Sequence, residues 1–405
     1  MESMVKNQVK ILIHPDIFYS GHSGAIAARE AARKLSGLGC EIGVFTHDPQ
    51  NKEVANYTYF QRIPYKGTAN YCPAEYKKSF LKVISEFKPN YVFFIGGIVN
   101  TPVVYFDLCM QYKIKTVFLL LVQDFYCVRL HAGLGENSCT KCLDGSNFNA
   151  LLNHCAEKQT RPLLMFLNYQ INQKLFLPRL RKIDFVLGSS DEQLDFYRRI
   201  GVKKSSIIKL PLFFDQNRVK ELKVTSKPYF VIIGQYRHEK GIHLISKILD
   251  FVNDGIVVKL LLFNQEEANR FQLEFTQNLK HIKSGKLEVL PGITMTNGAI
   301  ELIAGSKGVI NPSIWATTTE FVLVEVLGMA KPIITFDVGI HKEVIKNRIN
   351  GICVKAGDFK AMGDEINNLN NDPLLEHRIS IQAKKLFHEL TDDASFKSIL
   401  LAIFK

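Results

Sequence analysis

The sequence predicts an α/β protein made of two parallel-sheet domains that face a central cleft. Short apolar runs alternate with amphipathic segments along nearly the whole chain, the pattern of parallel strands covered by helices. A polar stretch without clear periodicity, residues 215–227, divides this alternation into two halves. The 405 residues, 46% of them hydrophobic, suffice for two full cores. Because ligand pockets favour domain interfaces, the cleft is the expected site.

The first domain is expected over residues 1–215. After a strand near residues 9–13, the small-residue turn Gly21 to Gly24 precedes a helix that Gly37 and Gly39 end. This turn is a weak phosphate-binding signal with Gly24 as its contact, because the full dinucleotide fingerprint is missing. Further strands are expected at 41–46, 91–95, 116–122, 185–188 and 207–210, and helices at 75–87, 103–112, 147–182 and from Asp191.

The second domain is expected over residues 228–375, followed by helices at 376–405. Its strands are predicted from Tyr229 and at 260–263, 287–290, 308–313, 332–336 and 352–354. The stretch from Asn311 to Glu343 reads as a strand end, a polar loop, a helix opening near Glu320, a second strand and a glycine turn. A loop between a strand and a helix presents free N–H groups and a positive dipole to phosphate, so this stretch is the candidate nucleotide site.

The charge distribution indicates an anionic partner. The formal charge is +12, and residues 1–215 hold 27 Lys and Arg against 18 Asp and Glu. A phospholipid surface or a pyrophosphate-bearing substrate would fit, and a merely basic soluble surface is the alternative. Nucleic acid is not expected, because the basic residues do not interleave with aromatic residues in a compact module. The polar N-terminus and the absence of an apolar run of ~20 residues predict a cytoplasmic protein.

Four of the eight cysteines cluster in the first domain: Cys127, Cys139, Cys142 and Cys155. A C-x-x-C pair with two more cysteines at loop distance suits a structural zinc ion. Reduced buried thiols and redox chemistry are the alternatives. A disulfide framework is not expected in a cytosolic chain.

Residues 161–182 combine a dense apolar stretch with Lys174, Arg179, Arg181 and Lys182. An amphipathic helix with a basic flank can lie on an anionic bilayer. The alternative is that its leucine and isoleucine residues at helical spacing belong to the core.

Four motifs in order resemble one family. Residues 234–241, GQYRHEKG, are similar to a G-R-x-x-x-E-K-G turn, and 311–315, NPSIW, to a P-S-x-W motif. Residues 324–326 with Pro332 resemble an E-A-x-x-x-x-x-P segment, and 339–343 a G-G-x-x-E turn. In this combination the chain resembles the retaining GT-B glycosyltransferases of family 4, especially bacterial enzymes of O-antigen or capsule biosynthesis.

The resemblance implies a GT-B fold of two Rossmann-like domains, with C-terminal helices crossing back to the first domain. It implies transfer of a sugar from a nucleotide-sugar held by the second domain to a saccharide or polyprenyl-pyrophosphate-linked acceptor held by the first. No cofactor or catalytic metal is expected. A peripheral position on the inner face of the plasma membrane would follow from a lipid-linked acceptor.

The resemblance also assigns roles to residues. Lys240 would neutralise the donor pyrophosphate, and Glu325 would accept both ribose hydroxyls. The main-chain N–H groups around Phe321, Val322 and Leu323 would meet phosphate. Gly339 and Glu343 would form a second sugar-contacting turn. The catalytic candidates are Asp124, Lys240 and Glu325.

Departures from the family pattern in the second domain weaken these roles. Thr317 stands where the family has its first glutamate, which approaches the donor sugar, and Glu320 is the candidate substitute. Gln235 replaces an expected arginine, and Arg237 could restore its charge if the loop bends toward the phosphates.

In the first domain Gln123-Asp124 replaces a His-Asp pair, which shifts any sugar contact to Asp124 or His131. Together the departures motivate an alternative hypothesis, in which the chain is a degenerate, non-catalytic relative that binds a partner in a polysaccharide assembly complex.

Overall fold

The computed structural model describes residues 8–19, 23–48, 57–64, 73–97, 101–121, 127–129, 133–134, 137–139, 141–142, 148–155, 162–210, 214–219, 222, 224–225, 227–274, 279–315, 317 and 320–404. The chain forms two compact units. Unit 1 comprises Met1–Ala132, Thr140–Phe214 and Asp392–Lys405, and unit 2 comprises Gly133–Cys139 and Asp215–Thr391.

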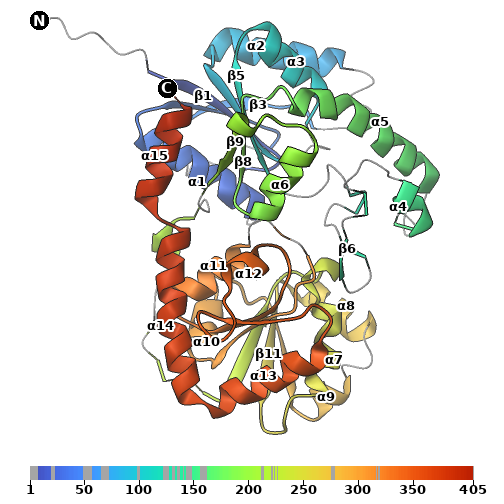
Figure 1. Cartoon of the computed structure of the whole chain (residues 1–405), viewed down its shortest axis with the longest axis vertical. Helices are drawn as coiled ribbons and strands as arrows, with labels where there is room; N and C mark the ends of the chain where they lie inside the picture. The colour runs from blue at the N-terminus through green and yellow to red at the C-terminus, as the bar shows by residue number, and fades with distance from the viewer. Residues whose placement is uncertain are drawn as a thin grey trace, which may run out of the picture. The chain divides into compact units, whose positions relative to one another are not determined.

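Unit 1 contains a seven-stranded sheet in which every pair of neighbours is parallel (Figure 1). The inner strands are buried on both faces, which is why they read as continuous apolar runs. In sheet order they are β3 (Thr58–Gln61), β2 (Glu41–Thr46), β1 (Lys10–Pro15), β4 (Tyr91–Gly96), β5 (Lys115–Leu120), β8 (Phe185–Gly188) and β9 (Ile207–Lys209).

Successive side chains of β4 lie on opposite faces of this sheet. Val92 and Phe94 join the main core, to which α2 (Ala74–Phe87), α3 (Val103–Gln111), α5 (Pro162–Leu180) and α6 (Asp191–Arg199) contribute. Tyr91 and Phe93 point the other way and meet Phe404, which directly follows α15 (Asp393–Ile403). On that face α1 (Ser23–Gly37) packs beside α15, where Lys34 pairs with Asp393.

The single long helix predicted over residues 147–182 is wrong. A short helix α4, Phe148–Leu152, ends in a turn where His154 has φ +50° and the Cys155 N–H bonds to the Ala150 carbonyl at 2.9 Å. A left-handed residue of this kind ends a helix because it turns the chain out of the helical path. Helix α5 then starts at Pro162, a residue suited to a first helical position.

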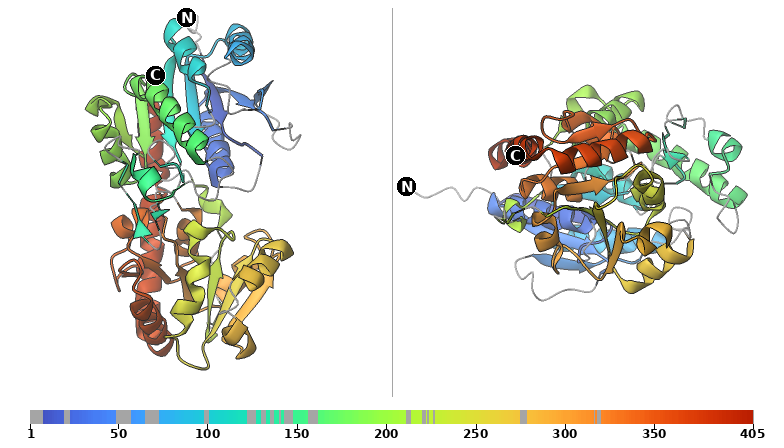
Figure 2. Two further views of the ribbon diagram at one scale, coloured as in Figure 1. Left: turned by 90° about the vertical axis from the view of Figure 1, so that its right-hand side faces the viewer. Right: turned by 90° about the horizontal axis from the view of Figure 1, so that it is seen from below.

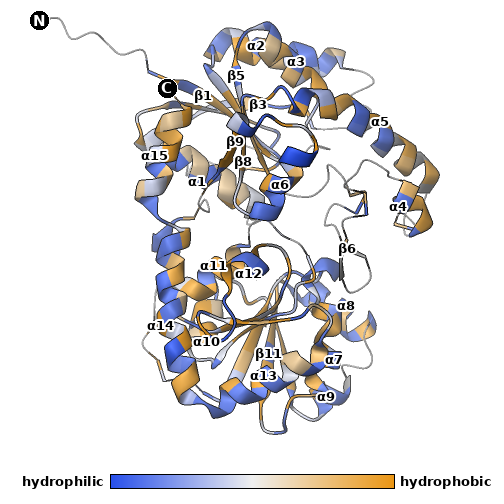
Figure 3. Ribbon diagram, in the orientation of Figure 1, coloured by the Kyte–Doolittle hydropathy of each residue, from blue (hydrophilic) through white to orange (hydrophobic). Residues whose placement is uncertain are grey.

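Unit 2 contains a six-stranded parallel sheet. In sheet order its strands are β12 (Leu287–Pro291), β11 (Val257–Leu262), β10 (Tyr229–Ile233), β13 (Gly308–Asn311), β14 (Ile333–Phe336) and β15 (Ile352–Val354). Figure 3 shows the strands of both sheets mostly in the hydrophobic colour. The sheet runs outward in both directions from β10 and β13, so its switch point lies between these two strands.

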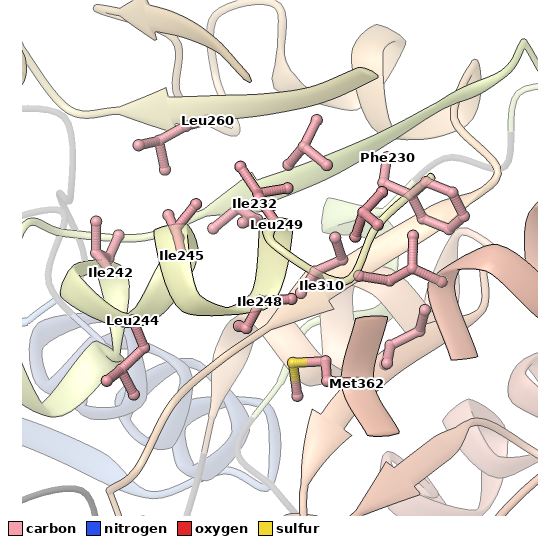
Figure 4. Close-up of a cluster of buried hydrophobic side chains, with 14 of the residues drawn as sticks. Phe230, Ile232, Ile242, Leu244, Ile245, Ile248, Leu249, Leu260, Ile310 and Met362 are labelled. Atoms are coloured by element: carbon pink, nitrogen blue, oxygen red, sulfur yellow. The ribbon is translucent and has the colours of Figure 1, made fainter. Parts of the chain in front are cut away.

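The helices of unit 2 cover both faces of this sheet (Figure 2). One core joins strand residues such as Phe230, Ile232 and Ile310 to Ile248 of α7 and Met362 of α13 (Figure 4). The helices are α7 (Ile245–Leu249), α8 (Gln265–Glu274), α9 (Leu279–Lys283), α10 (Ala299–Ala304), α11 (Phe321–Gly328), α12 (Gly339–Val344), α13 (Phe359–Asn371) and α14 (Pro373–Leu390), with 3₁₀ turns η2 (Gln216–Arg218), η3 (His238–Lys240) and η4 (Ile242–Leu244).

The chain leaves unit 2 after α14, which packs on α11 so closely that a Cβ atom at Gly328 would lie 2.8 Å from the Phe387 ring. The return to unit 1 begins at Asp392, later than the boundary at residue 376 expected from the sequence. A small hairpin, β6 (Gly133–Leu134) and β7 (Asn137–Ser138), precedes Cys139. Within the described ranges, no helix has the length and apolarity to cross a membrane.

Candidate functional site

Three turns meet at the carboxyl edge of the unit 2 sheet. They follow the adjacent strands β10, β13 and β14, and they carry η3, the loop that leads into α11, and α12. The carboxyl edge beside a switch point is where open parallel sheets bind nucleotides. The stretch from Asn311 to Glu343 supplies two of these three turns, so the expected site lies on one edge of one sheet.

Gly241 allows the first turn to approach the second. Its φ is +69°, and a Cβ atom there would lie 1.8 Å from the Pro312 carbonyl oxygen. The Ser313 hydroxyl and the Ile314 N–H both donate to the Glu239 carbonyl, at 3.2 and 3.1 Å. The glycine therefore permits a close contact that places η3 directly against the loop after β13.

Glu320 lies where the three turns converge. Lys240 Nζ is 2.7 Å from its Oε1 atom, and His341 Nε2 is 2.8 Å from its Oε2 atom. Burial would raise the pKa of this carboxyl, but Lys240 and His341 outweigh burial and hold the pKa well below its usual range. Glu320 occupies the N-cap position of α11, yet its side chain makes no capping hydrogen bond. The buried carboxylate lies against Lys240 and His341 instead.

His341 was not recognised from the sequence. It is fully buried in α12, and its Nδ1 atom lies 2.7 Å from the Thr335 hydroxyl of β14. The only sequence signal was its place in the glycine turn between Gly339 and Glu343.

Glu325 lies in the second turn of α11 and is 6% exposed. Burial raises its pKa to about 7, against the opposing effect of Arg218, whose Nη2 atom lies 3.9 Å from Glu325 Oε1. Arg218 belongs to η2, in the stretch that the sequence assigned to the linker. It is a second site residue that sequence reasoning missed.

The first turn of α11 consists of Phe321, Val322 and Leu323, which are apolar side chains on a helix N-terminus. The first N–H groups of any helix have no partner within that helix. Their dipoles point out of the α11 N-terminus, so this end of the helix suits an anionic ligand.

The remaining candidate residues of unit 2 take supporting places. Arg237 is exposed, and its Nε atom lies 2.5 Å from Glu239 Oε1, so its charge is paired. Its N–H donates to the Gln235 carbonyl at 2.8 Å. The carbonyl of the buried Thr317 accepts the Ile340 N–H at 2.9 Å, which ties the loop to α12. Gly339 begins α12 at φ +49°, and Glu343 is half-buried one turn later.

The candidates in the N-terminal part of the chain are only partly described. Gly24 lies in the first turn of α1 in unit 1. Gln123, Asp124 and His131 lie outside the described residues, so the role suggested for Asp124 stays a prediction.

The four clustered cysteines are half-buried. Cys142 and Cys155 border a small apolar cluster, whereas Cys127 packs against the main core of unit 1. Across the part of the chain that the structure describes, which includes all four thiols, no three His, Cys, Asp or Glu residues form a group that could hold a metal ion. The thiols as placed do not make a zinc site, and zinc stays a prediction from their spacing.

Comparisons with known proteins agree with this architecture. Residues 213–386 match the family described as glycosyl transferases group 1. Among curated proteins none matches the chain by sequence.

Solved structures match over almost the whole chain. A sucrose-phosphate synthase from Thermosynechococcus elongatus superposes with a TM-score of 0.73 at 12% identity, covering 98% of each chain. Anabaena HepE in complex with UDP and glucose superposes with a TM-score of 0.71 at 13% identity, over 98% of this chain and 99% of that one. The lipopolysaccharide outer core galactosyltransferase WaaB, in its apo form, superposes with a TM-score of 0.65 at 14% identity, covering 98% of this chain and 99% of that one.

These likenesses confirm the predicted fold of two parallel-sheet α/β domains. Residues 213–386 of this chain are therefore similar to glycosyl transferases group 1, and the fold of the chain matches that of GT-B glycosyltransferase structures.

Proposed function

We propose that the protein is a retaining glycosyltransferase that moves a sugar from a nucleotide-sugar to a saccharide or polyprenyl-pyrophosphate-linked acceptor in surface polysaccharide biosynthesis. Unit 2 would bind the donor and unit 1 the acceptor. One observation carries the proposal: beside the switch point of the unit 2 sheet, Lys240 pairs with Glu320 at the N-terminus of α11, and the next turn of this helix carries Glu325.

This arrangement supplies what a nucleoside diphosphate leaving group needs. The Lys240 ammonium and the α11 N–H groups offer positive charge to the pyrophosphate, so positive charge is available without a metal ion. The ionised Glu325 carboxylate can accept both ribose hydroxyls. These interactions stabilise charge that develops on the phosphate as the bond to the sugar breaks.

Retention requires the acceptor hydroxyl to attack from the face that the leaving group vacates. In the proposed reaction the sugar C1–O bond to phosphate breaks, and the acceptor oxygen forms the new bond on the same face. The acceptor proton passes to a phosphate oxygen of the departing nucleoside diphosphate. The protein then contributes mainly by positioning the reactants and stabilising the leaving group, so the reaction tolerates threonine at position 317.

The decisive experiment is a donor panel of UDP-, GDP- and dTDP-sugars with saccharide and lipid-linked acceptors. UDP-sugars come first, because a structure of similar fold, Anabaena HepE, was solved with UDP-glucose. We expect sugar transfer with one donor and its loss in Glu325→Ala. Tight nucleotide binding without turnover of any donor would instead support the non-catalytic alternative that Thr317 and Gln235 suggest.

An anionic membrane surface is a further part of the proposal, and helix α5 supports it. Leu163, Leu167 and Ile171 follow one another at four-residue spacing and are 62%, 48% and 42% exposed. The exposed Lys174 continues this stripe. Arg179 does not contribute, because it makes two hydrogen bonds to Asp107 at 2.8 and 2.7 Å. An exposed apolar stripe beside a lysine suits the inner face of the plasma membrane.

Flotation with anionic liposomes tests this surface. We expect the wild-type protein to float at low salt, and the combined change Leu163→Gln and Leu167→Gln to leave it in the soluble fraction. The matched control is Leu374→Gln in α14, because Leu374 is also highly exposed, at 80%. Wild-type protein that stays soluble, or equal flotation of all three proteins, would remove the membrane from the proposal.

A structural zinc ion at Cys127, Cys139, Cys142 and Cys155 remains a separate proposal from their spacing. Metal analysis of protein purified without chelator tests it, and protein without stoichiometric zinc would contradict it.

A further inference from the structure

Glu320 is a deeply buried charged side chain at the candidate site. It is 4% exposed, and each of its carboxylate oxygens faces a different nitrogen, Lys240 Nζ at 2.7 Å and His341 Nε2 at 2.8 Å. A residue that contacts the donor sugar would need an oxygen directed at the ligand. Both Glu320 oxygens instead lie within 3 Å of protein nitrogens, one on the turn after β10 and one on the turn after β14.

The Lys240 ammonium is held from two sides. Glu320 accepts one of its hydrogen bonds, and the Trp315 ring lies 5.1 Å from Nζ. An ammonium has three donors, so a lysine held through one N–H keeps two for a ligand. The Lys240 side chain is 20% exposed, so the ammonium is held without being sealed off.

Glu320 is itself oriented from the sheet. Thr335 lies on β14 with its hydroxyl 2.7 Å from His341 Nδ1, and His341 Nε2 faces Glu320 on the other side of the ring. Thr335 and His341 are both fully buried. The contacts therefore run without a break from a rigid strand to the ammonium, which fixes the lysine before any ligand arrives.

We propose that Glu320, oriented by His341, is a positioning residue that holds the Lys240 ammonium at the donor phosphates and does not contact the donor sugar. The inference rests on the proposed function, in which Lys240 binds the donor pyrophosphate. It assigns Glu320 a role unlike that of the family glutamate missing at position 317.

Measurements of nucleotide binding distinguish a Glu320 that positions Lys240 from a Glu320 that contacts the donor sugar. UDP, GDP and dTDP are titrated by calorimetry, and the tightest-binding nucleotide and its nucleotide-sugar are kept as probes. We expect Glu320→Gln to weaken the nucleoside diphosphate about tenfold and the nucleotide-sugar by the same factor, because the lost interaction lies at the phosphates. His341→Asn should produce a smaller loss in the same direction.

A double-variant comparison tests whether Glu320 acts through Lys240. Lys240→Met should weaken the nucleoside diphosphate, and adding Glu320→Gln should cost little more, because the lysine that Glu320 holds is already gone. Under turnover, Glu320→Gln should raise the donor KM more than it lowers kcat.

Three results would overturn the inference. Loss of nucleotide-sugar affinity with unchanged nucleoside diphosphate affinity would make Glu320 a sugar contact. Fully additive losses of nucleoside diphosphate affinity in the Lys240→Met and Glu320→Gln variants would show that Glu320 does not act through Lys240. Tighter nucleoside diphosphate binding in Glu320→Gln would show that Glu320 competes with phosphate for the lysine.

The matched control is Glu376→Gln, which breaks another largely buried pair of the same unit, Lys307–Glu376 at 3.0 Å. It should match Glu320→Gln in its effect on thermal unfolding and leave nucleotide affinity unchanged. Equal loss of affinity in both variants would indicate general destabilisation and contradict positioning. A wild-type protein that binds none of the three nucleotides would overturn the proposed function itself, whereas normal wild-type binding with an unaffected Glu320→Gln variant overturns the inference alone.

Discussion

Glu320 and Glu325 lie close together on the chain and are both buried, yet their pKa values move in opposite directions. Burial raises the pKa of both carboxyls. Glu320 has Lys240 and His341 within 3 Å, and these neighbours reverse the effect. Arg218, 3.9 Å from Glu325, opposes the effect of burial there but does not reverse it. One carboxyl is therefore ionised at neutral pH, and the other titrates there.

The raised pKa of Glu325 predicts pH-dependent donor binding. Only the ionised carboxylate can accept two ribose hydroxyls, and its pKa is about 7. Below that value we expect nucleotide-sugar affinity to fall, approaching tenfold per pH unit, while Glu325→Gln binds more weakly with little pH dependence between pH 6 and 8. The nucleotide-sugar is the right probe, because its pyrophosphate diester keeps its charge over this range. Parallel pH profiles for wild type and variant would contradict the assignment.

The raised pKa of Glu325 also predicts that the stability of the protein depends on pH. Its folded-state pKa lies above its ordinary value of 4.5, so the folded state favours the protonated form. The contribution of Glu325 to stability is complete below pH 4.5 and is lost as the pH rises through about 7. Urea unfolding at pH 6 and pH 8, followed through Trp315, the single tryptophan, should show a smaller stability difference in Glu325→Gln than in the wild type. An unchanged difference would exclude Glu325 as its source.

At the scale of elements, the site depends on one close approach between turns. Gly241 combines a left-handed backbone with a carbonyl oxygen where its Cβ atom would be. Gly255 shares the positive φ, at +86°, but has open space around it. A comparison of substitutions at Gly241 and Gly255 therefore distinguishes the cost of backbone strain from the cost of a steric clash.

Substitution by alanine should lower the free energy of unfolding by different amounts at the two positions. Gly255→Ala should lose about 1 kcal/mol from backbone strain alone. Gly241→Ala adds a clash with the Pro312 carbonyl and should lose about 3 kcal/mol or more. Urea unfolding followed by Trp315 fluorescence reports unit 2 alone, since Trp315 lies in that unit. Equal losses would show that the turn adapts to the added methyl group.

Element boundaries show where the sequence was ambiguous. The helix at Phe321 and its strand neighbours were predicted correctly, because apolar runs and the polar loop between them are strong local signals. The interruption after Leu152 was missed, because a left-handed residue such as His154 has no reliable composition signal. Helical periodicity continues on either side of it.

At the scale of the whole molecule, the last helix returns to the first unit. Phe404 places its ring 4.9 Å from the Tyr91 ring and 6.0 Å from the Phe93 ring on the face of the sheet away from the main core. Lys34 of α1 lies 4.8 Å from the Phe396 ring centre and also pairs with Asp393. The C-terminus thus helps to cover one face of the unit 1 sheet.

Phe404→Ala should therefore destabilise unit 1 by about 3 kcal/mol through the cavity it leaves. Hydrogen exchange of the β4 amides measures this loss within unit 1. The matched control is Leu401→Ala on α15, where the side chain is 53% exposed and the expected loss is below about 1 kcal/mol. Equal protection of β4 in both variants would show that Phe404 does not stabilise the sheet.

The sequence alone determined the class of fold and predicted a candidate nucleotide site at residues 311–343. Periodicity reports strands and helices, and the turns after β10, β13 and β14 carried recognisable motifs, including Lys240 and Glu325. Tertiary structure alone decided what those residues touch. Glu320, Lys240 and His341 come from three separate turns, and Arg218 reaches Glu325 from the supposed linker. Contacts between residues far apart in the chain depend on strand order and side-chain direction, which no local pattern records.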